Sequence, residues 1–249
     1  VWELPRENHG DRLAALSNYL MYLHYVDGIT DAMMHDAHAV YAQMLGTLPQ
    51  FSHASHHRDK LRIGYLSPNM TDHIVLNFAV QLFSAYDRAR FSVHLYDVGG
   101  QHSEVTDWVA GMVDGYADLS QCSARAAAER IYADEVDILF DLAGHSAGGK
   151  TLPIAAYKPA PVQISGIGYF NTTGLATVDY MLSDVHVDPI GTTDPAFTEE
   201  MIRLPHSHFC YMLPEDLPSL TPLPMERRGY VTFGSFNNFS KVTDEVLRL

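Results

Sequence analysis

Short apolar segments alternate with segments of helical periodicity from residue 61 onward. The apolar segments lie at 61–66, 91–96, 116–119, 136–142, 161–165 and 180–183. Helical patterns separate most of them, at 75–86, 104–113, 124–133 and 151–157. Helices of this length between strands are typical of right-handed crossovers, because parallel strands need a long connection. The pattern therefore predicts an α/β fold, a mostly parallel sheet with helices on both faces.

The first 60 residues have a different pattern. Apolar residues recur at three- and four-residue spacing over 11–46, which predicts two helices separated near Gly28. Thr30 is a suitable N-cap for the second helix. We expect four parts in the chain: a helical bridge and linker at 1–60, a sheet lobe at 61–188, an irregular connector at 189–228, and the start of a second lobe at 229–249 with a strand at 230–236.

Acidic residues outnumber basic ones. The 249 residues include 30 Asp and Glu against 16 Lys and Arg, a formal net charge of −14. This charge argues against bulk binding of nucleic acid or anionic membranes, although a small basic pocket for one phosphate ligand stays compatible with it. Cys122 and Cys210 have no metal-type spacing, which favours a reduced, cytoplasmic setting. The chain starts without Met and ends in a helical pattern, so we expect it to be part of a longer protein.

Two histidines follow predicted strands at the edge of the sheet where ligands bind. His73 comes after the first strand, and His145 comes after the fourth in the glycine-rich segment 143–150. Either histidine alone is more simply read as a helix cap or a side chain bonded to a backbone carbonyl, but two at one edge favour a functional site. Histidine suits a general base because its pKa lies near neutrality. Three glycines are expected to let the backbone approach a ligand: Gly144, Gly148 and Gly149.

Other polar segments have two interpretations each. The segment 168–174 (GYFNTTG) is either a turn or a substrate cradle formed by Thr172, Thr173 and Gly174. The histidines at 206 and 208, and those at 53, 56 and 57, would suggest a metal. No further ligand follows them at a recognised spacing, so no metal site is predicted.

Four motifs occur in order: LRIGYLSPNMTDHIVLNF, VDILFDLAGHSAGG, KPAPVQISGIGYFNTTGLATVDYMLSD and VTFGSFNNFSK. From about Leu13 to the C-terminus the chain resembles the catalytic region of the O-linked N-acetylglucosamine transferase family, in particular its bacterial tetratricopeptide-repeat-associated and SPINDLY-like members. The resemblance implies the Rossmann-like N-terminal lobe of a GT-B glycosyltransferase. It also implies tetratricopeptide repeats upstream, joined through the helical bridge.

The resemblance further implies a reaction and its residues. N-acetylglucosamine or a related sugar would pass, with inversion, from a UDP donor to Ser or Thr of an acceptor protein, without a metal or other cofactor. His73 matches the proposed base, and His145 lies in a motif near donor and acceptor. Asn238 matches a uridine-diphosphate contact, and Lys241 matches the lysine that supports the leaving diphosphate. Most nucleotide contacts of the family lie in the second lobe, so the isolated chain is expected to be nearly inactive.

The chain departs from the family pattern beside the predicted site. Residues 72–74 read Asp-His-Ile where Asn-His-Pro is usual, Asn77 replaces a frequent second histidine, and Phe170-Asn171 replaces Pro-Gly. Donor and acceptor therefore stay open. Three alternatives also stay open: a related transferase that glucosylates Asn, a non-catalytic binding or scaffold module, and an unrelated flavodoxin-like nucleotide-binding domain.

Overall fold

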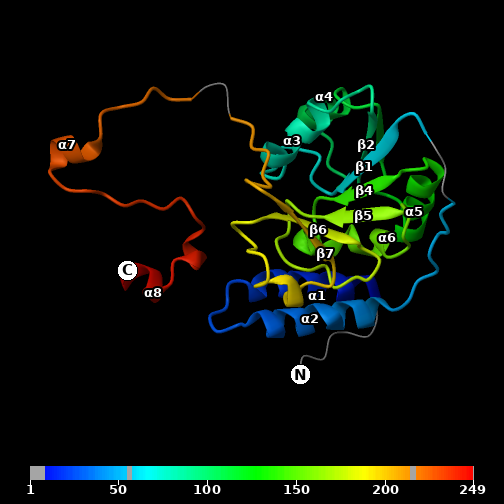
Figure 1. Ribbon diagram of the computed structural model, residues 1–249, viewed down its shortest axis with the longest axis horizontal. Helices are drawn as coiled ribbons and strands as arrows, with labels where there is room; N and C mark the ends of the chain where they lie inside the picture. The colour runs from blue at the N-terminus through cyan, green and yellow to red at the C-terminus, as the bar shows by residue number, and fades with distance from the viewer. Residues whose placement is uncertain (1–8, 55–57, 214–216, 249) are drawn as a thin grey trace.

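The computed structural model describes residues 9–54, 58–213 and 217–248. One sheet of seven strands has the order β3-β2-β1-β4-β5-β6-β7 (Figure 1). All neighbouring strands are parallel, which confirms the predicted α/β class. The strands are β1 (Leu61–Ser67), β2 (Phe91–Asp97), β3 (Gly115–Asp118), β4 (Ile138–Asp141), β5 (Val162–Ser165), β6 (Tyr180–Asp184) and β7 (Glu200–Leu204).

Helices cover both faces of the sheet, and each face has its own core. One core joins Tyr65 of β1 to Phe83 and Val109, which lie on α3 and α4. The other joins Leu66 to Ile131 of α5. Adjacent residues of a strand point to opposite faces, so a strand covered on both sides buries consecutive residues, as the second half of β1 does. The helices are α3 (Leu76–Ser84), α4 (Glu104–Ala110), α5 (Ala124–Ala133) and α6 (Leu152–Ala155).

The predicted helical pair consists of α1 (His9–Leu23) and α2 (Asp31–Leu45). Thr30 caps α2 as expected, because its hydroxyl oxygen accepts a hydrogen bond from the Met33 N–H at 3.3 Å. Leu20 and Tyr41 are fully buried and share a third core with Leu152 of α6. The pair is therefore packed against the sheet lobe through α6 rather than standing apart from it.

The predicted irregular connector at 189–228 is wrong for its first part. β7 lies within it and adds a seventh parallel strand beside β6. After β7, the chain folds back over α3, where the Met212 N–H donates to the Asn77 carbonyl at 2.7 Å and Tyr211 packs on Phe78. The sheet lobe thus extends beyond the predicted boundary at 188. Proline and acidic residues in the surrounding segment concealed the strand, which is short, lies at the edge of the sheet and is only partly buried.

The C-terminal arm, 217–248, leaves the lobe and returns toward α1 and α2 (Figure 1). It carries only short helices: α7 (Pro224–Arg228), η3 (Phe239–Lys241) and α8 (Asp244–Arg248). The predicted strand at 230–236 is absent, although these residues are described and exposed. A strand needs a partner for its backbone groups, and no described segment pairs with this one.

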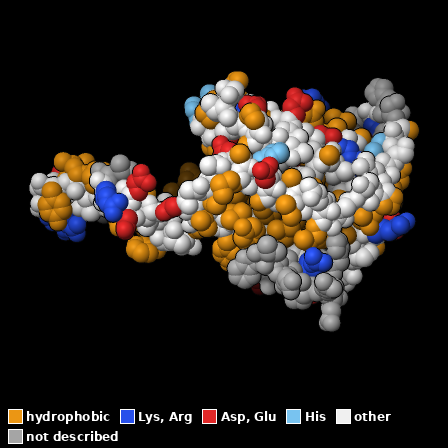
Figure 2. All heavy atoms as spheres, turned by 90° about the horizontal axis from the view of Figure 1, so that it is seen from below, with side chains coloured by type: hydrophobic (Ala, Val, Ile, Leu, Met, Phe, Trp, Pro, Cys, Tyr) orange, Lys and Arg blue, Asp and Glu red, His pale blue; other side chains and the backbone are white. Residues whose placement is uncertain are grey.

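The outer face of the helical pair is apolar. Figure 2 shows hydrophobic side chains gathered on the side of the molecule where α1 and α2 lie. Four large side chains on these helices are about half exposed or more: Tyr19, Tyr22, Met33 and Val40. None of the helices in the described ranges is long and apolar enough to cross a membrane.

Candidate active site

The order in which the chain adds strands to the sheet reverses between β1 and β4. β2 and β3 lie on one side of β1, and β4 with the later strands lies on the other. Loops that leave the carboxyl ends of β1 and β4 therefore diverge, and ligands of open α/β sheets bind in the crevice between such loops. His73 lies on the loop after β1, and His145 lies on the loop after β4. The predicted pair of loops is thus brought to one edge, at the switch point.

His73 is exposed on its loop. Its Nδ1 accepts a hydrogen bond from the Val75 N–H at 3.3 Å, so the neutral ring carries its proton on Nε2. Partial burial lowers the pKa of His73, which keeps the ring neutral at pH 7. No hydrogen bond, ion pair or ring contact among the described residues joins His73 to His145 or Lys241.

His145 lies in the interior. Its side chain is fully buried and packs edge-on against Tyr41 at 4.6 Å between ring centroids. Nε2 donates to the Thr173 carbonyl at 3.0 Å, since a carbonyl can only accept, and Nδ1 therefore accepts from the Ser17 hydroxyl at 2.9 Å. His145 thus joins α1 to the 168–174 loop with both ring nitrogens occupied. Its predicted catalytic role stays a prediction, and these contacts describe a positioning residue.

Two of the glycines after β4 allow their loop to lie close to α1. A Cβ on Gly149 would overlap the Ser17 hydroxyl, and a Cβ on Gly148 would lie 3.5 Å from the Ala14 Cβ. Both glycines have positive φ angles, which a larger residue adopts only with strain. They let the loop lie against α1. The prediction that they bring backbone close to a ligand stays a prediction, and in this structure they accommodate α1.

Asp141 organises the start of the same loop. This buried carboxylate accepts the Ala143 N–H at 2.9 Å, the Gly144 N–H at 2.9 Å and the Ser165 hydroxyl at 2.9 Å. Burial raises the pKa of Asp141, and the three hydrogen bonds oppose this shift by stabilising the charged form. The loops after β4 and β5 are therefore held together by one side chain at the sheet edge.

A second buried histidine orients Tyr169. His38 Nδ1 donates to the Met34 carbonyl at 2.6 Å, so Nε2 accepts the Tyr169 hydroxyl at 2.7 Å. His24 packs edge-on against the same tyrosine ring, with 5.4 Å between centroids. Its Nε2 accepts from the Asn171 amide at 3.2 Å, because its Nδ1 faces the Leu20 carbonyl. The helical pair thus contributes two histidines to the position of the 168–174 loop.

The turn before this loop is strained. Ile167 has φ +68°, and it lies at the centre of a turn closed by the Gly168 N–H and the Gly166 carbonyl at 2.8 Å. A left-handed conformation is unfavourable for a β-branched residue. Such strain concentrates at functional sites. It occurs here where β5 ends and the cavity described below begins.

Thr172 and Thr173 are fully buried, with their hydroxyls directed to Glu199. Thr172 Oγ1 donates to Glu199 Oε2 at 2.7 Å, and the Thr173 N–H donates to Oε1 at 2.8 Å. The Gly174 N–H in turn donates to Thr172 Oγ1 at 3.0 Å. The predicted substrate contacts of these three residues stay predictions. The structure gives their polar groups internal partners instead.

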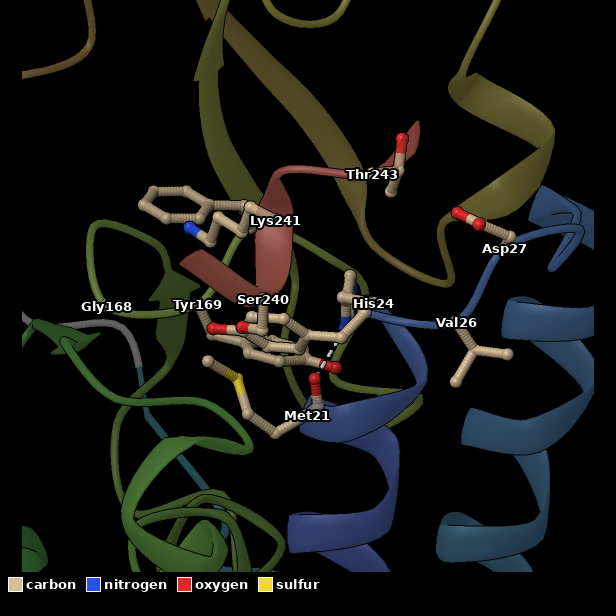
Figure 3. A pocket seen from close by; sticks show the side chains of 11 residues that line it. Met21, His24, Val26, Asp27, Gly168, Tyr169, Ser240, Lys241 and Thr243 are labelled. Atoms are coloured by element: carbon tan, nitrogen blue, oxygen red, sulfur yellow. Dashed lines mark hydrogen bonds between the residues drawn. The ribbon is translucent and has the colours of Figure 1, made fainter. Parts of the chain in front are cut away.

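Lys241 lies at a cavity of about 490 Å³ between the helical pair, the 168–174 loop and the C-terminal arm. Figure 3 shows Lys241 above Tyr169 and His24, with Asp27 and Thr243 farther along the wall. The ammonium is 5.8 Å from the centre of the Tyr25 ring, within the range of a cation–π contact. Lys241, which the sequence predicted as a site residue, therefore lines the same cavity as the 168–174 loop. That loop contributes Gly168, Tyr169 and Phe170 to the lining.

Asn238 lies just before the helical turn that carries Lys241. Its Oδ1 accepts the Ser240 N–H at 3.1 Å and the Ser240 hydroxyl at 2.9 Å, which caps η3. The Asn238 side chain is exposed. Its predicted contact with a uridine diphosphate stays a prediction, and in this structure its role is to begin the turn that presents Lys241.

No group of three or more potential metal ligands is gathered within the described ranges. Of the histidines considered for a metal, His208 is bound to Asp184, and His53 Nε2 donates a hydrogen bond to the Lys158 carbonyl at 2.8 Å. Residues 56 and 57 lie outside the described residues.

The buried histidines predict a pH-dependent stability. Burial lowers the pKa of His38 to about 4 and that of His145 to about 3, against 6.5 for a free imidazole. Below pH 6.5 these two histidines bind protons in the unfolded chain but stay neutral in the folded chain. Their contribution to the free energy of unfolding is therefore fully present above pH 6.5 and is lost as the pH falls toward 4. Two such groups cost about 2 kcal/mol between pH 6.5 and 5.5.

Urea unfolding at several pH values measures this slope. The double variant H38Q/H145Q is expected to flatten it, whatever its absolute stability, while the variant H206Q at an exposed histidine leaves it unchanged. A slope identical in the double variant and the natural chain would contradict the assignment.

The sequence argument missed several residues that hold the site. Asp141 had a signal, since it is the charged residue that ends an apolar strand, and His24 and His38 lie in the segment 11–46 that was predicted to be helical. Glu199 had none, because it belongs to a segment without periodicity. His208 was considered only as a metal ligand beside His206, and its partner Asp184 was not foreseen. Glu199 and His208 each contact a residue that is distant in the sequence, and local sequence patterns do not reveal such contacts.

The fold and the cavity together define an α/β lobe with a cavity between the loop after β5, the helical pair and the C-terminal arm. The family model described as Glycosyl transferase family 41 matches residues 34–221. The chain therefore belongs to glycosyl transferase family 41, and the family resemblance found in its motifs is confirmed.

Curated relatives and a solved structure resemble most of the chain. It is 33% identical over 247 residues to a probable UDP-N-acetylglucosamine–peptide N-acetylglucosaminyltransferase SPINDLY of Petunia hybrida, covering 96% of this chain and 26% of that protein. The corresponding enzyme of Caenorhabditis elegans is 31% identical over 177 residues, 68% of this chain and 15% of that protein. A mutant O-GlcNAc transferase of Thermobaculum terrenum superposes with TM-score 0.85 at 29% identity, covering 95% of this chain and 45% of that chain. The chain spans about a quarter of the length of the plant relative.

Proposed function

We propose that this chain forms the N-terminal lobe and helical bridge of an inverting transferase that moves N-acetylglucosamine, or a related sugar, from a UDP donor to Ser or Thr of a protein. Family 41 membership and the names of the relatives support the reaction class. The observation that carries the proposal is Lys241 at a cavity shared by the 168–174 loop and the helical pair. The donor sugar and the acceptor are part of the proposal.

The chemistry of the cavity suits a metal-free transfer. Departure of a nucleoside diphosphate leaves negative charge on its oxygens, and a lysine ammonium directed at them stabilises that charge in the transition state. Among the described residues, no acidic side chain forms a salt bridge with Lys241, and its ammonium faces the Tyr25 ring, so its charge is available to a ligand. We therefore propose that Lys241 supplies the cation that other transferases obtain from a metal.

Transfer of label measures the proposed function directly. The natural full-length protein is incubated with UDP-N-acetylglucosamine carrying a labelled sugar and with a Ser/Thr-containing peptide, with and without EDTA. Labelled peptide and free UDP are expected, in equal amounts and unchanged by EDTA. Label on an Asn-containing peptide alone would indicate the Asn-directed alternative, and UDP-sugar binding without any transfer would indicate the non-catalytic one.

His73→Ala is expected to lower kcat by about 10²-fold, the usual contribution of a general base. To receive the hydroxyl proton on Nε2, the ring must carry its own proton on Nδ1, which breaks only the 3.3 Å contact with Val75. Steady-state kinetics at saturating donor and peptide test the role. His102→Ala, at another exposed histidine beside this edge, is the control. A normal kcat in His73→Ala would remove this residue from proton transfer.

The apolar face of α1 and α2 supports the expected upstream repeats. Tyr22 is 69% exposed and Tyr19 52%, so a packed helical repeat would remove substantial apolar surface from water. We propose that tetratricopeptide repeats of the natural protein pack on this side.

A further inference from the structure

A buried histidine–carboxylate pair lies at the carboxyl end of β6. His208 Nδ1 and Asp184 Oδ2 are 2.6 Å apart, and both side chains are almost inaccessible to solvent, at 2% and 4%. Asp184 also accepts the N–H groups of His186 and Val187 at 2.9 Å, as well as that of His208 at 3.0 Å. These hydrogen bonds keep the pKa of Asp184 well below its usual range, so the carboxylate is charged.

The second ring nitrogen of His208, Nε2, makes no hydrogen bond within the described part of the chain. Because Nδ1 donates its hydrogen to a charged carboxylate, Nε2 of the neutral ring carries a lone pair. This atom is buried and has no hydrogen-bond partner among the described residues. A buried polar atom left without a partner costs about 1–3 kcal/mol, so such atoms call for an explanation.

The pair lies one side chain away from the cavity of Lys241. Phe170 packs edge-on against the His208 ring, with 6.1 Å between centroids, and the same phenylalanine lines the cavity. Phe209 covers another side of the imidazole at 4.1 Å. Phe170 is 57% exposed, so its ring can move without opening the core. Phe170 therefore contacts the imidazole and also lines the cavity.

We propose that His208, oriented by Asp184, binds a hydroxyl group of the substrate, with Nε2 as the acceptor and Phe170 as a movable cover. The inference rests on the proposed function, because it takes the hydroxyl from one of the two partners of the transfer. That hydroxyl belongs either to the sugar of the donor or to the Ser or Thr of the acceptor. No bond is made or broken at His208.

Two variants of His208 separate binding from structure. In His208→Asn, the amide nitrogen takes the place of Nδ1 and keeps the bond to Asp184, but nothing replaces Nε2. In His208→Gln, the amide reaches the place of Nε2 and loses the bond to Asp184. His206→Asn, at an exposed histidine two residues earlier, is the control.

Calorimetry and kinetics on the natural full-length protein give the readouts. If the sugar hydroxyl is bound, His208→Asn lowers the affinity for UDP-N-acetylglucosamine about 10-fold and leaves the affinity for UDP unchanged. This is the loss expected for one hydrogen bond of about 1.4 kcal/mol. If the acceptor hydroxyl is bound, the KM for the Ser/Thr peptide rises about 10-fold while donor affinity stays normal. In either case the thermal unfolding midpoint stays near that of the natural protein, and His208→Gln recovers part of the loss.

The opposite pattern overturns the proposal. Normal donor affinity and normal peptide KM in His208→Asn, together with a lowered unfolding midpoint in His208→Gln, would make the pair purely structural. Donor binding and transfer by the natural protein itself are measured in the same series. Their absence would remove the proposed function, whereas their presence with an unaffected His208→Asn removes this inference alone.

Discussion

Replacing Lys241 with alanine in the natural full-length protein is expected to lower kcat by about 10²- to 10³-fold, the usual effect of removing one group that stabilises developing negative charge. The substrate diphosphate gains charge only as the sugar leaves, so the lysine acts more strongly on the transition state than on the bound donor. The change in KM is therefore expected to be much smaller than the change in kcat. Initial rates over a range of UDP-N-acetylglucosamine concentrations measure both.

Two further variants sharpen the interpretation of this result. Lys241→Arg keeps the positive charge but replaces a compact ammonium by a planar group, so it is expected to recover only part of the rate. Lys60→Ala removes an exposed lysine at the opposite edge of the sheet, just before β1, and is expected to leave kcat unchanged. A raised KM with normal kcat in Lys241→Ala would mean that the lysine binds the donor without acting on its departure.

The second large effect is expected on stability. A Cβ on Gly168 would overlap the Leu142 carbonyl oxygen and lie 3.0 Å from the Leu142 carbonyl carbon. Both atoms belong to the backbone that follows β4, which Asp141 holds, so neither can yield easily. Gly168→Ala is expected to lower the free energy of unfolding by about 3 kcal/mol or more, at the upper end for overpacking. Urea unfolding at pH 7.5, above the range in which the buried histidines titrate, measures it.

Gly111→Ala is the matched control, because a Cβ there meets only carbonyl oxygens at 3.5 Å, an ordinary contact. It is expected to change the stability by less than about 0.5 kcal/mol. Equal stabilities of the two alanine variants would show that the loops after β4 and β5 separate readily. The close packing of these loops at the cavity would then be lost as an argument.

Local patterns predicted the sheet lobe well and its far end poorly. Strands such as β1 and β4 are apolar because they are buried on both faces, and a buried parallel strand records that burial in consecutive residues. β7 lies at the edge of the sheet with only intermediate burial, so no such record exists. The opposite error occurred at 230–236, where an apolar pattern has no described partner strand to pair with.

In the candidate site, too, positions along the chain could be predicted, whereas contacts between distant residues could not. The positions of His73 and His145 after two strands, and the place of Lys241 in its motif, could be predicted from the chain alone. What each side chain faces could not. His145 is 128 residues from Ser17, which it contacts, and Thr173 is 26 residues from Glu199. A residue's neighbours in sequence do not reveal partners at such separations.

By itself, then, the sequence determined the alternation of strands and helices, the loops at the ligand edge and the family, because all of these depend on local periodicity or on contiguous motifs. Only the tertiary structure decided that His145 is inside, that the two threonines serve Glu199, and that Lys241 shares a cavity with Tyr169. It alone also brought His208 to Asp184. Each of these depends on which buried polar group finds a partner, and that is settled when distant segments pack together.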